Sequence, residues 1–181
     1  MPQTSVAVGS MMSVLSYAAF AFFPLMMAYA AASDLLTMTI PNLVTVALVL
    51  GFFVIAPLAL GMDLPTIGMH AVSGGAMLAI GFLLFVFGWI GGGDAKIASA
   101  AALWLGVSDT IEFVVWTSIL GGGLSLLLLI LKQRLSPALA VRYSWLHRLH
   151  DPETGVPYGL ALGGAALLVY PQTIWITLVS G

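Results

Sequence analysis

The sequence predicts an all-α fold, a polytopic transmembrane bundle of about six helices that forms a single domain over residues 1–181. Two observations favour this class. Hydrophobic residues make up 61% of the chain and charged residues only 7%, whereas an ordinary soluble domain carries about 25% charged residues. The apolar segments are also continuous and approach the ~20 residues that cross a bilayer as a helix, while a membrane β-barrel would show short alternating segments.

Six apolar segments are expected to form the helices. They cover residues 11–32, 42–61, 67–90, 95–107, 110–131 and 156–179. The fourth has 13 residues, so it must borrow flanking residues, lie inside the bundle or be re-entrant. No basic residue precedes Lys96, and because a secretory signal needs a positively charged start, the first segment is expected to be retained.

The composition excludes several kinds of function. Five Lys and Arg residues cannot build a phosphate-binding surface, so nucleic acid is not an expected partner. The absence of cysteine excludes disulfides, thiolate chemistry and cysteine-bound zinc, and no cofactor or metal is expected. One polar cluster fits a solvated loop better than a metal site, because its spacing matches no ligand pattern: His147, His150, Asp151 and Glu153.

The basic residues predict an orientation through the positive-inside rule. Four of the five lie in one long polar loop, about residues 132–155, which we place in the cytoplasm: Lys132, Arg134, Arg142 and Arg148. Counting crossings backward from this loop puts Lys96 on the same side. Both termini then lie outside.

Two aspartates meet at the cytoplasmic side in this topology. Asp34 ends the first apolar segment, and Asp94 follows the glycine run Gly91–Gly93 after the third. The chain between them crosses the membrane out and back, so both carboxylates return to one end of the bundle. Ionisable groups at membrane depth are costly and usually face the bundle interior or a water-filled cavity. These two residues are therefore a candidate acid–base pair.

Such a pair has a well-defined chemistry. Two neighbouring carboxylates cannot both ionise cheaply, so they share a proton and titrate together. The ionised carboxylate takes a proton from a water held between them, while the neutral one hydrogen-bonds the substrate carbonyl and steadies the gem-diol. The glycines before Asp94 can take positive φ and admit a close backbone approach; alternatively they form an ordinary turn, with Asp94 as a helix N-cap.

Three motifs carry a resemblance to a known family. They are Asp34 with Ile40-Pro41-Asn42, then Gly91-Gly92-Gly93-Asp94-Ala95-Lys96, and then Val156-Pro157-Tyr158-Gly159. Their order and spacing, over about residues 12–180, resemble the type IV prepilin peptidases, most closely the small branch associated with tight-adherence (Flp) pili. The Gly-x-Gly-Asp motif also occurs in presenilin-like proteases, whereas the three motifs together are specific.

The resemblance implies a bacterial aspartic endopeptidase that cuts the leader peptide of type IV or Flp prepilins after a glycine, at the cytoplasmic face of the inner membrane. Asp34 and Asp94 would be the catalytic pair that activates water. The implied substrate-binding or site-shaping residues are Gly91, Gly93, Lys96, Pro41, Asn42, Pro157 and Tyr158. The implied partners are the prepilin, the lipid bilayer and, as a candidate, the pilus assembly machinery.

The chain departs from the family pattern in two places. Larger members carry a cysteine-bearing domain that binds zinc, and they methylate the new N-terminus; this chain has no cysteine, so neither feature is expected. Relatives often carry basic residues after the first aspartate, where Leu35–Thr39 has none. Lys96 either tunes Asp94 by its charge or anchors its helix at the headgroups. Pro157 and Tyr158 either border the site or only begin the last helix.

The remaining aromatic and small residues have structural interpretations. Tryptophans near the segment ends or loops fit an aromatic belt at the membrane interface: Trp89, Trp104, Trp145 and Trp175. His70 is expected at the interface. Glycines away from the aspartates indicate close helix packing: Gly74, Gly75, Gly121–Gly123, Gly163 and Gly164.

Three other functions fit part of the pattern. Carboxylates inside membranes also serve proton relays and ion sites, but here they lie at helix ends and no inverted repeat is visible. A presenilin-like protease of another substrate class would lack the Ile-Pro-Asn and Pro-Tyr-Gly motifs. A structural subunit of a secretion machine would tolerate the loss of both aspartates.

Overall fold

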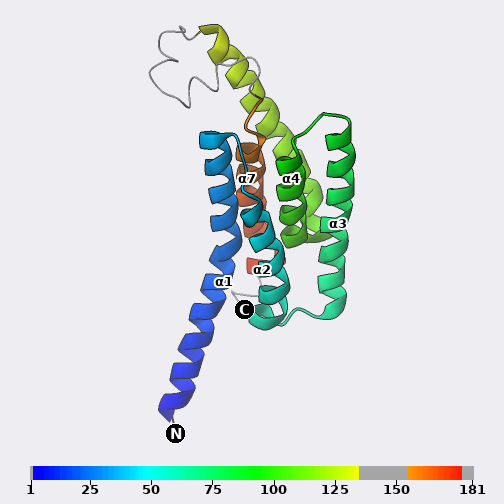
Figure 1. Cartoon of the computed structure of the whole chain (residues 1–181). Helices are drawn as coiled ribbons and strands as arrows, with labels where there is room; N and C mark the ends of the chain where they lie inside the picture. Colours follow the sequence, from blue (N-terminus) through cyan, green and yellow to red (C-terminus); the bar gives the residue numbers. More distant parts are fainter. Residues whose placement is uncertain (1, 135–154, 177–181) are drawn as a thin grey trace.

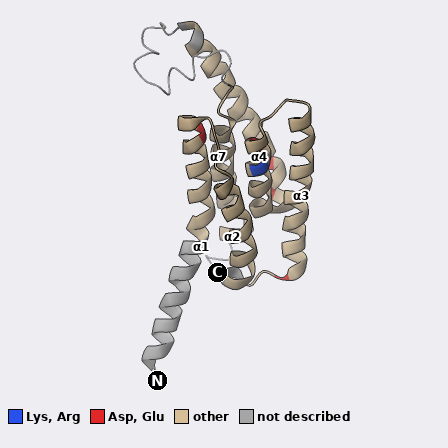
Figure 2. Ribbon diagram, in the orientation of Figure 1, with Lys and Arg blue, Asp and Glu red and all other residues tan. Residues whose placement is uncertain are grey.

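A computed structural model shows a helical bundle and confirms the predicted all-α class. The structure describes residues 2–134 and 155–176. Within them every regular element is a helix. Charged residues are sparse along these helices, so most of the ribbon in Figure 2 is tan.

The helices are α1 (Pro2–Thr37), α2 (Asn42–Leu60), α3 (Leu64–Val86), α4 (Gly92–Arg134), α7 (Tyr158–Val169) and a turn of 3-10 helix, η1 (Tyr170–Gln172). Short connections join α1 to α2, α2 to α3 and α3 to α4 (Figure 1). Three segments are long and apolar enough to cross a membrane: Phe20–Thr37, Leu64–Val86 and Gly92–Leu131. Their length and composition are those of a membrane protein.

Helix α4 is two helices joined at Gly106. The backbone there is non-helical, with φ 77° and ψ −180°, in a region that is essentially restricted to glycine. Ala98 before the break and Thr117 after it line the same cavity, so the two halves lie side by side. The first half ends in buried residues, from Ala100 to Leu105. The short fourth segment therefore gains flanking residues at its start and lies inside the bundle.

Two helices end earlier than the sequence analysis expected. Helix α3 stops at Val86, before residue 90, and Gly88 then takes a left-handed φ of 74°. Helix α7 stops at Val169 because Pro171 follows, and proline breaks a helix interior; helical structure resumes at Ile174. Most of the predicted cytoplasmic loop lies outside the described residues, together with Arg142, Trp145, Arg148 and the His147–Glu153 cluster.

Helix α7 packs between α1 and α4 (Figure 1). Its contact with α1 is made by Gly159 and Gly163, which are four residues apart, the spacing that lets membrane helices approach closely. A Cβ on Gly163 would lie 2.7 Å from the Cβ of Ala31, and one on Gly159 would lie 2.8 Å from the Cβ of Asp34. The predicted packing role therefore holds for Gly163, whereas Gly75 and Gly123 adjoin open space.

The aromatic-belt interpretation is wrong for two tryptophans. Trp104 and Trp175 expose 0% and 1% of their surface, and their ring centroids are 4.5 Å apart in the core. The indole N–H of Trp104 donates to the carbonyl oxygen of Leu48 at 2.9 Å. Trp89 is exposed. Because a backbone carbonyl inside the bundle accepts its N–H, the Trp104 indole does not require the polar groups of the membrane interface.

His70 is also buried, exposing 6% of its surface, so the expected interfacial position is wrong. Its Nδ1 lies 2.8 Å from the carbonyl oxygen of Leu103 and donates to it. This carbonyl belongs to the last turn before the break at Gly106, where helix carbonyls lose their intrahelical partners. His70 therefore provides a hydrogen-bond donor for the Leu103 carbonyl, which the reversal of the chain at Gly106 leaves without an intrahelical partner.

The reversal predicts the behaviour of two glycine variants. In Gly106→Ala the new Cβ would lie 2.9 Å from the His70 ring in a backbone conformation that alanine avoids, so we expect a loss of about 3 kcal/mol of stability. Gly88→Ala is the control: φ is also positive but nothing lies within 4 Å, and the expected loss is about 1 kcal/mol. Thermal unfolding in detergent measures both, and equal unfolding temperatures would contradict the role of the His70 contact.

Candidate active site

A polar cavity of about 340 Å³ lies at one end of the bundle. Its walls come from the end of α1 with the following loop, from the start of α4, and from residues 155–156. Asp34, in the last turn of α1, and Asp94, in the first turn of α4, both line it. The two carboxyl groups are close enough for their charges to interact, although 60 residues separate them in the chain.

Asp34 is held by the first turn of α7. It exposes 7% of its surface, and its Oδ2 accepts a hydrogen bond of 2.7 Å from the backbone N–H of Gly159. The first amides of a helix have no intrahelical acceptor, and Pro157, which precedes α7, offers no side-chain cap. Asp34 thus caps α7 from a different helix, and the hydrogen bond fixes its carboxylate.

The same contact requires glycine at residue 159. A Cβ there would lie 2.8 Å from Oδ2 of Asp34 and 2.9 Å from Cδ1 of Ile40. Sequence reasoning placed Gly159 in a motif but did not include it among the site residues. Its spacing from Gly163 was the sequence feature that could have identified it.

Asp94 lies inside the first turn of α4, so the N-cap interpretation is wrong in detail. The helix begins at Gly92, and the carboxylate receives a hydrogen bond from the backbone of Gly91, as an acidic side chain in the first turn does in a capping box. A Cβ on Gly91 would lie 3.0 Å from Oδ2 of Asp94. Glycine therefore suits residue 91 because the Asp94 carboxylate approaches it closely, and not because of a positive φ. Among the described residues the glycines with positive φ are Gly61, Gly88 and Gly106.

Lys96 and Asn42 form a polar contact at the cavity wall. The Nζ of Lys96 donates to Oδ1 of Asn42 at 3.1 Å, and both residues line the cavity with Gly93. The bond joins the start of α2 to the first turns of α4. Neither of the two roles considered for Lys96 included this partner.

Three of the expected site-shaping residues lie outside the polar cavity wall. Pro41 precedes α2 and the buried Pro157 precedes α7, so both set where a helix begins. Tyr158 lines a neighbouring apolar cavity that also includes Asp94. Its ring packs on Gly121, where a Cβ would lie 2.7 Å from Cε1 of the tyrosine.

The fold and the site together define a helical membrane protein with two carboxylates in one cavity at its helix ends. The model of the type IV leader peptidase family matches residues 21–126, which include both aspartates and more than half of the chain. The protein belongs to this family and is a peptidase. No curated protein and no solved structure matches the chain.

The contact between Asp34 and Gly159 predicts the effect of a single methyl group. In Gly159→Ala the Cβ must displace the Asp34 carboxylate or the start of α7, and a displacement of about 1 Å can cost an enzyme on the order of 100-fold in rate. We expect this loss in kcat for peptide cleavage. Gly164→Ala, on the same helix, is the control, since its Cβ would meet only the end of the Leu120 side chain, at 3.2 Å. Equal activity in the two variants would show that the Asp34 contact is dispensable.

Proposed function

We propose that the protein is an aspartic endopeptidase that removes the leader peptide of type IV or Flp prepilins, cutting after a glycine at the cytoplasmic face of the bacterial inner membrane. The observation that carries this proposal is the placement of Asp34 and Asp94 on the wall of one cavity. Family membership supplies the class of reaction and implies a prepilin substrate.

The chemistry needs only the two carboxyl groups and one water. The ionised carboxylate takes a proton from the water, whose oxygen bonds to the peptide carbonyl carbon, while the protonated carboxyl group gives its proton to the carbonyl oxygen. As the resulting gem-diol collapses and the C–N bond breaks, the proton on the first carboxylate passes to the leaving amine, and the second carboxylate takes back a proton from one gem-diol hydroxyl. Each carboxyl group returns to a state from which the next cycle can begin.

The position of the cavity suits a substrate whose apolar helix lies in the same membrane. Asp34 is three residues from the end of α1, and Asp94 is the third residue of α4. A scissile bond at the membrane surface can reach such a site while the apolar helix of the substrate stays in the bilayer. The substrate has to unwind only near this bond. Under the positive-inside rule the basic residues of the 132–155 loop assign this end to the cytoplasm.

The catalytic pair is tested by removing one ionisable group at a time. Asp34→Asn and Asp94→Asn keep the size and a hydrogen-bond acceptor, so both variants should fold. Each should lose cleavage entirely, because the one carboxyl group that remains cannot act as both the base and the acid. The control is Asp63→Asn. Asp63 caps α3 by accepting the N–H of Thr66 at 3.1 Å, and asparagine caps equally well. Hydrogen bonds from the side chain and from the backbone of Thr66 hold the pKa of the Asp63 carboxyl group below its ordinary value.

The assay co-expresses each variant with a candidate Flp-type prepilin and follows the leader by gel shift and N-terminal sequencing. Wild type and Asp63→Asn should trim the leader after a glycine, at equal abundance of all variants in the membrane. Trimming by folded Asp34→Asn or Asp94→Asn would refute the pair. Uncut prepilin together with proton flux through the reconstituted wild type would favour the ion-transport alternative.

A further inference from the structure

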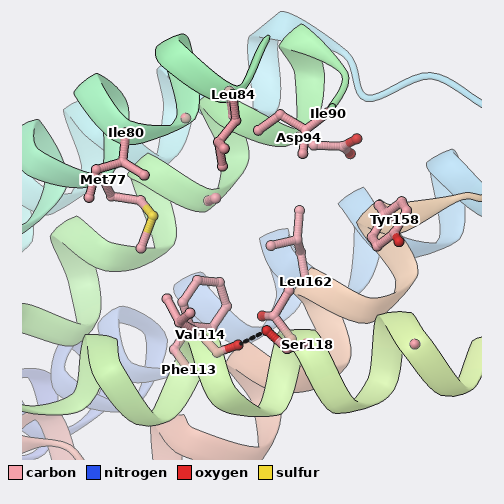
Figure 3. A pocket seen from close by; sticks show the side chains of 15 residues that line it. Met77, Ile80, Leu84, Ile90, Asp94, Phe113, Val114, Ser118, Tyr158 and Leu162 are labelled. Atoms are coloured by element: carbon pink, nitrogen blue, oxygen red, sulfur yellow. Dashed lines mark hydrogen bonds between the residues drawn. The ribbon is translucent and has the colours of Figure 1, made fainter. Parts of the chain in front are cut away.

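A second cavity, of about 380 Å³, begins at Asp94 and continues between α3, both halves of α4, and α7 (Figure 3). Met77, Ile80 and Leu84 form its α3 side, opposite Val114 of α4 and Leu162 of α7. We call this space the apolar groove. Its volume is more than twice the roughly 150 Å³ of a cavity that holds benzene, so it has room for several apolar side chains.

We propose that the apolar groove binds the apolar segment of the prepilin that adjoins the scissile bond, and that it thereby selects which chains are cut. This inference rests on the proposed peptidase function and names a substrate site for it.

Continuity with the polar cavity is the first support. Asp94 lines both spaces, and Figure 3 places it with Tyr158 at one end of the groove. The polar cavity adds Lys96 and Asn42 on its side of Asp94, whereas the groove continues into aliphatic side chains. A chain whose scissile carbonyl lies at the aspartates therefore has a polar path on one side and an apolar path on the other.

The lining of the groove favours a polypeptide over a lipid chain. Ala98 and Gly122 stand on its walls, and small residues let another helix approach a membrane helix closely. Thr117 also lines the groove, and its buried Oγ1 has no hydrogen-bond partner among the described residues. Buried hydroxyl groups normally have a partner, and a bound peptide can provide one, whereas an acyl chain cannot.

Two adjacent glycines of α4 provide a matched pair of variants. A Cβ on Gly122 or on Gly123 would meet nothing within 4 Å, so a side chain can start from either residue without a clash at its Cβ. Only Gly122 lines the groove. Gly122→Leu thus occupies the groove, while Gly123→Leu adds the same side chain to the same helix outside it.

The steady-state test uses the reconstituted full-length protein and two substrates: a full-length prepilin, and a short peptide with the leader and scissile bond but without the apolar segment. For Gly122→Leu the KM for the prepilin should rise about tenfold or more, the scale set by apolar pocket contacts, while the KM for the peptide stays at the wild-type value. Gly123→Leu should match wild type on both. Equal KM values for Gly122→Leu and Gly123→Leu on the prepilin would overturn the proposal.

A crosslinking test separates this site from the catalytic proposal. A photocrosslinking amino acid replaces Gly122 or Gly123 in an Asp34→Asn background, so its readout does not depend on cleavage. Adducts with prepilin at Gly122 and not at Gly123 support the groove as its binding site. Adducts with lipid alone, or equal prepilin adducts at both residues, overturn it. Cleavage by Asp34→Asn would instead refute the catalytic pair and leave the crosslinking result standing.

Discussion

The close approach of α1 and α7 is the constraint on which the rest of the site depends. Gly159 and Gly163 bring the backbone of α7 against Asp34 and Ala31, at distances that leave no room for a side chain on either glycine. That approach puts the free amide of Gly159 within 2.7 Å of the Asp34 carboxylate. A carboxylate that is largely buried in an apolar bundle needs such a donor, and the amino end of a helix favours negative charge. Asp94, in the first turn of α4, has the same kind of environment.

Hydropathy and counting were sufficient to bring the two aspartates together. Each membrane crossing reverses the chain, so two residues separated by an outward and an inward crossing must return to one side, whatever the packing between them. The orientation could be deduced from a few basic residues. In a chain with only 7% charged residues, the side of the membrane assigned to each basic residue strongly restricts the possible topologies. Motif order then pointed to the family, and the family model that matches residues 21–126 confirms it.

Packing was beyond the reach of such reasoning, since hydropathy treats the protein core and the bilayer as one solvent. Trp104 and His70 were assigned to the interface for this reason, although both have internal carbonyl partners, at Leu48 and Leu103. Glycines were ambiguous for a related reason. Three consecutive glycines, Gly121, Gly122 and Gly123, cannot be told apart from the sequence. In the structure the first lies under the Tyr158 ring, the second borders the apolar groove and the third adjoins open space.

The two cavities that share Asp94 also restrict what kind of peptide suits the site. A uniformly polar peptide would have to desolvate polar groups along the apolar groove, and a uniformly apolar one would meet Lys96 and Asn42 without satisfying them. Both mismatches are costly. A chain that changes from polar to apolar within a few residues of the bond at Asp94 avoids both, and a leader joined to a membrane helix has that polarity. On this argument the site recognises the change in polarity before it recognises any individual side chain.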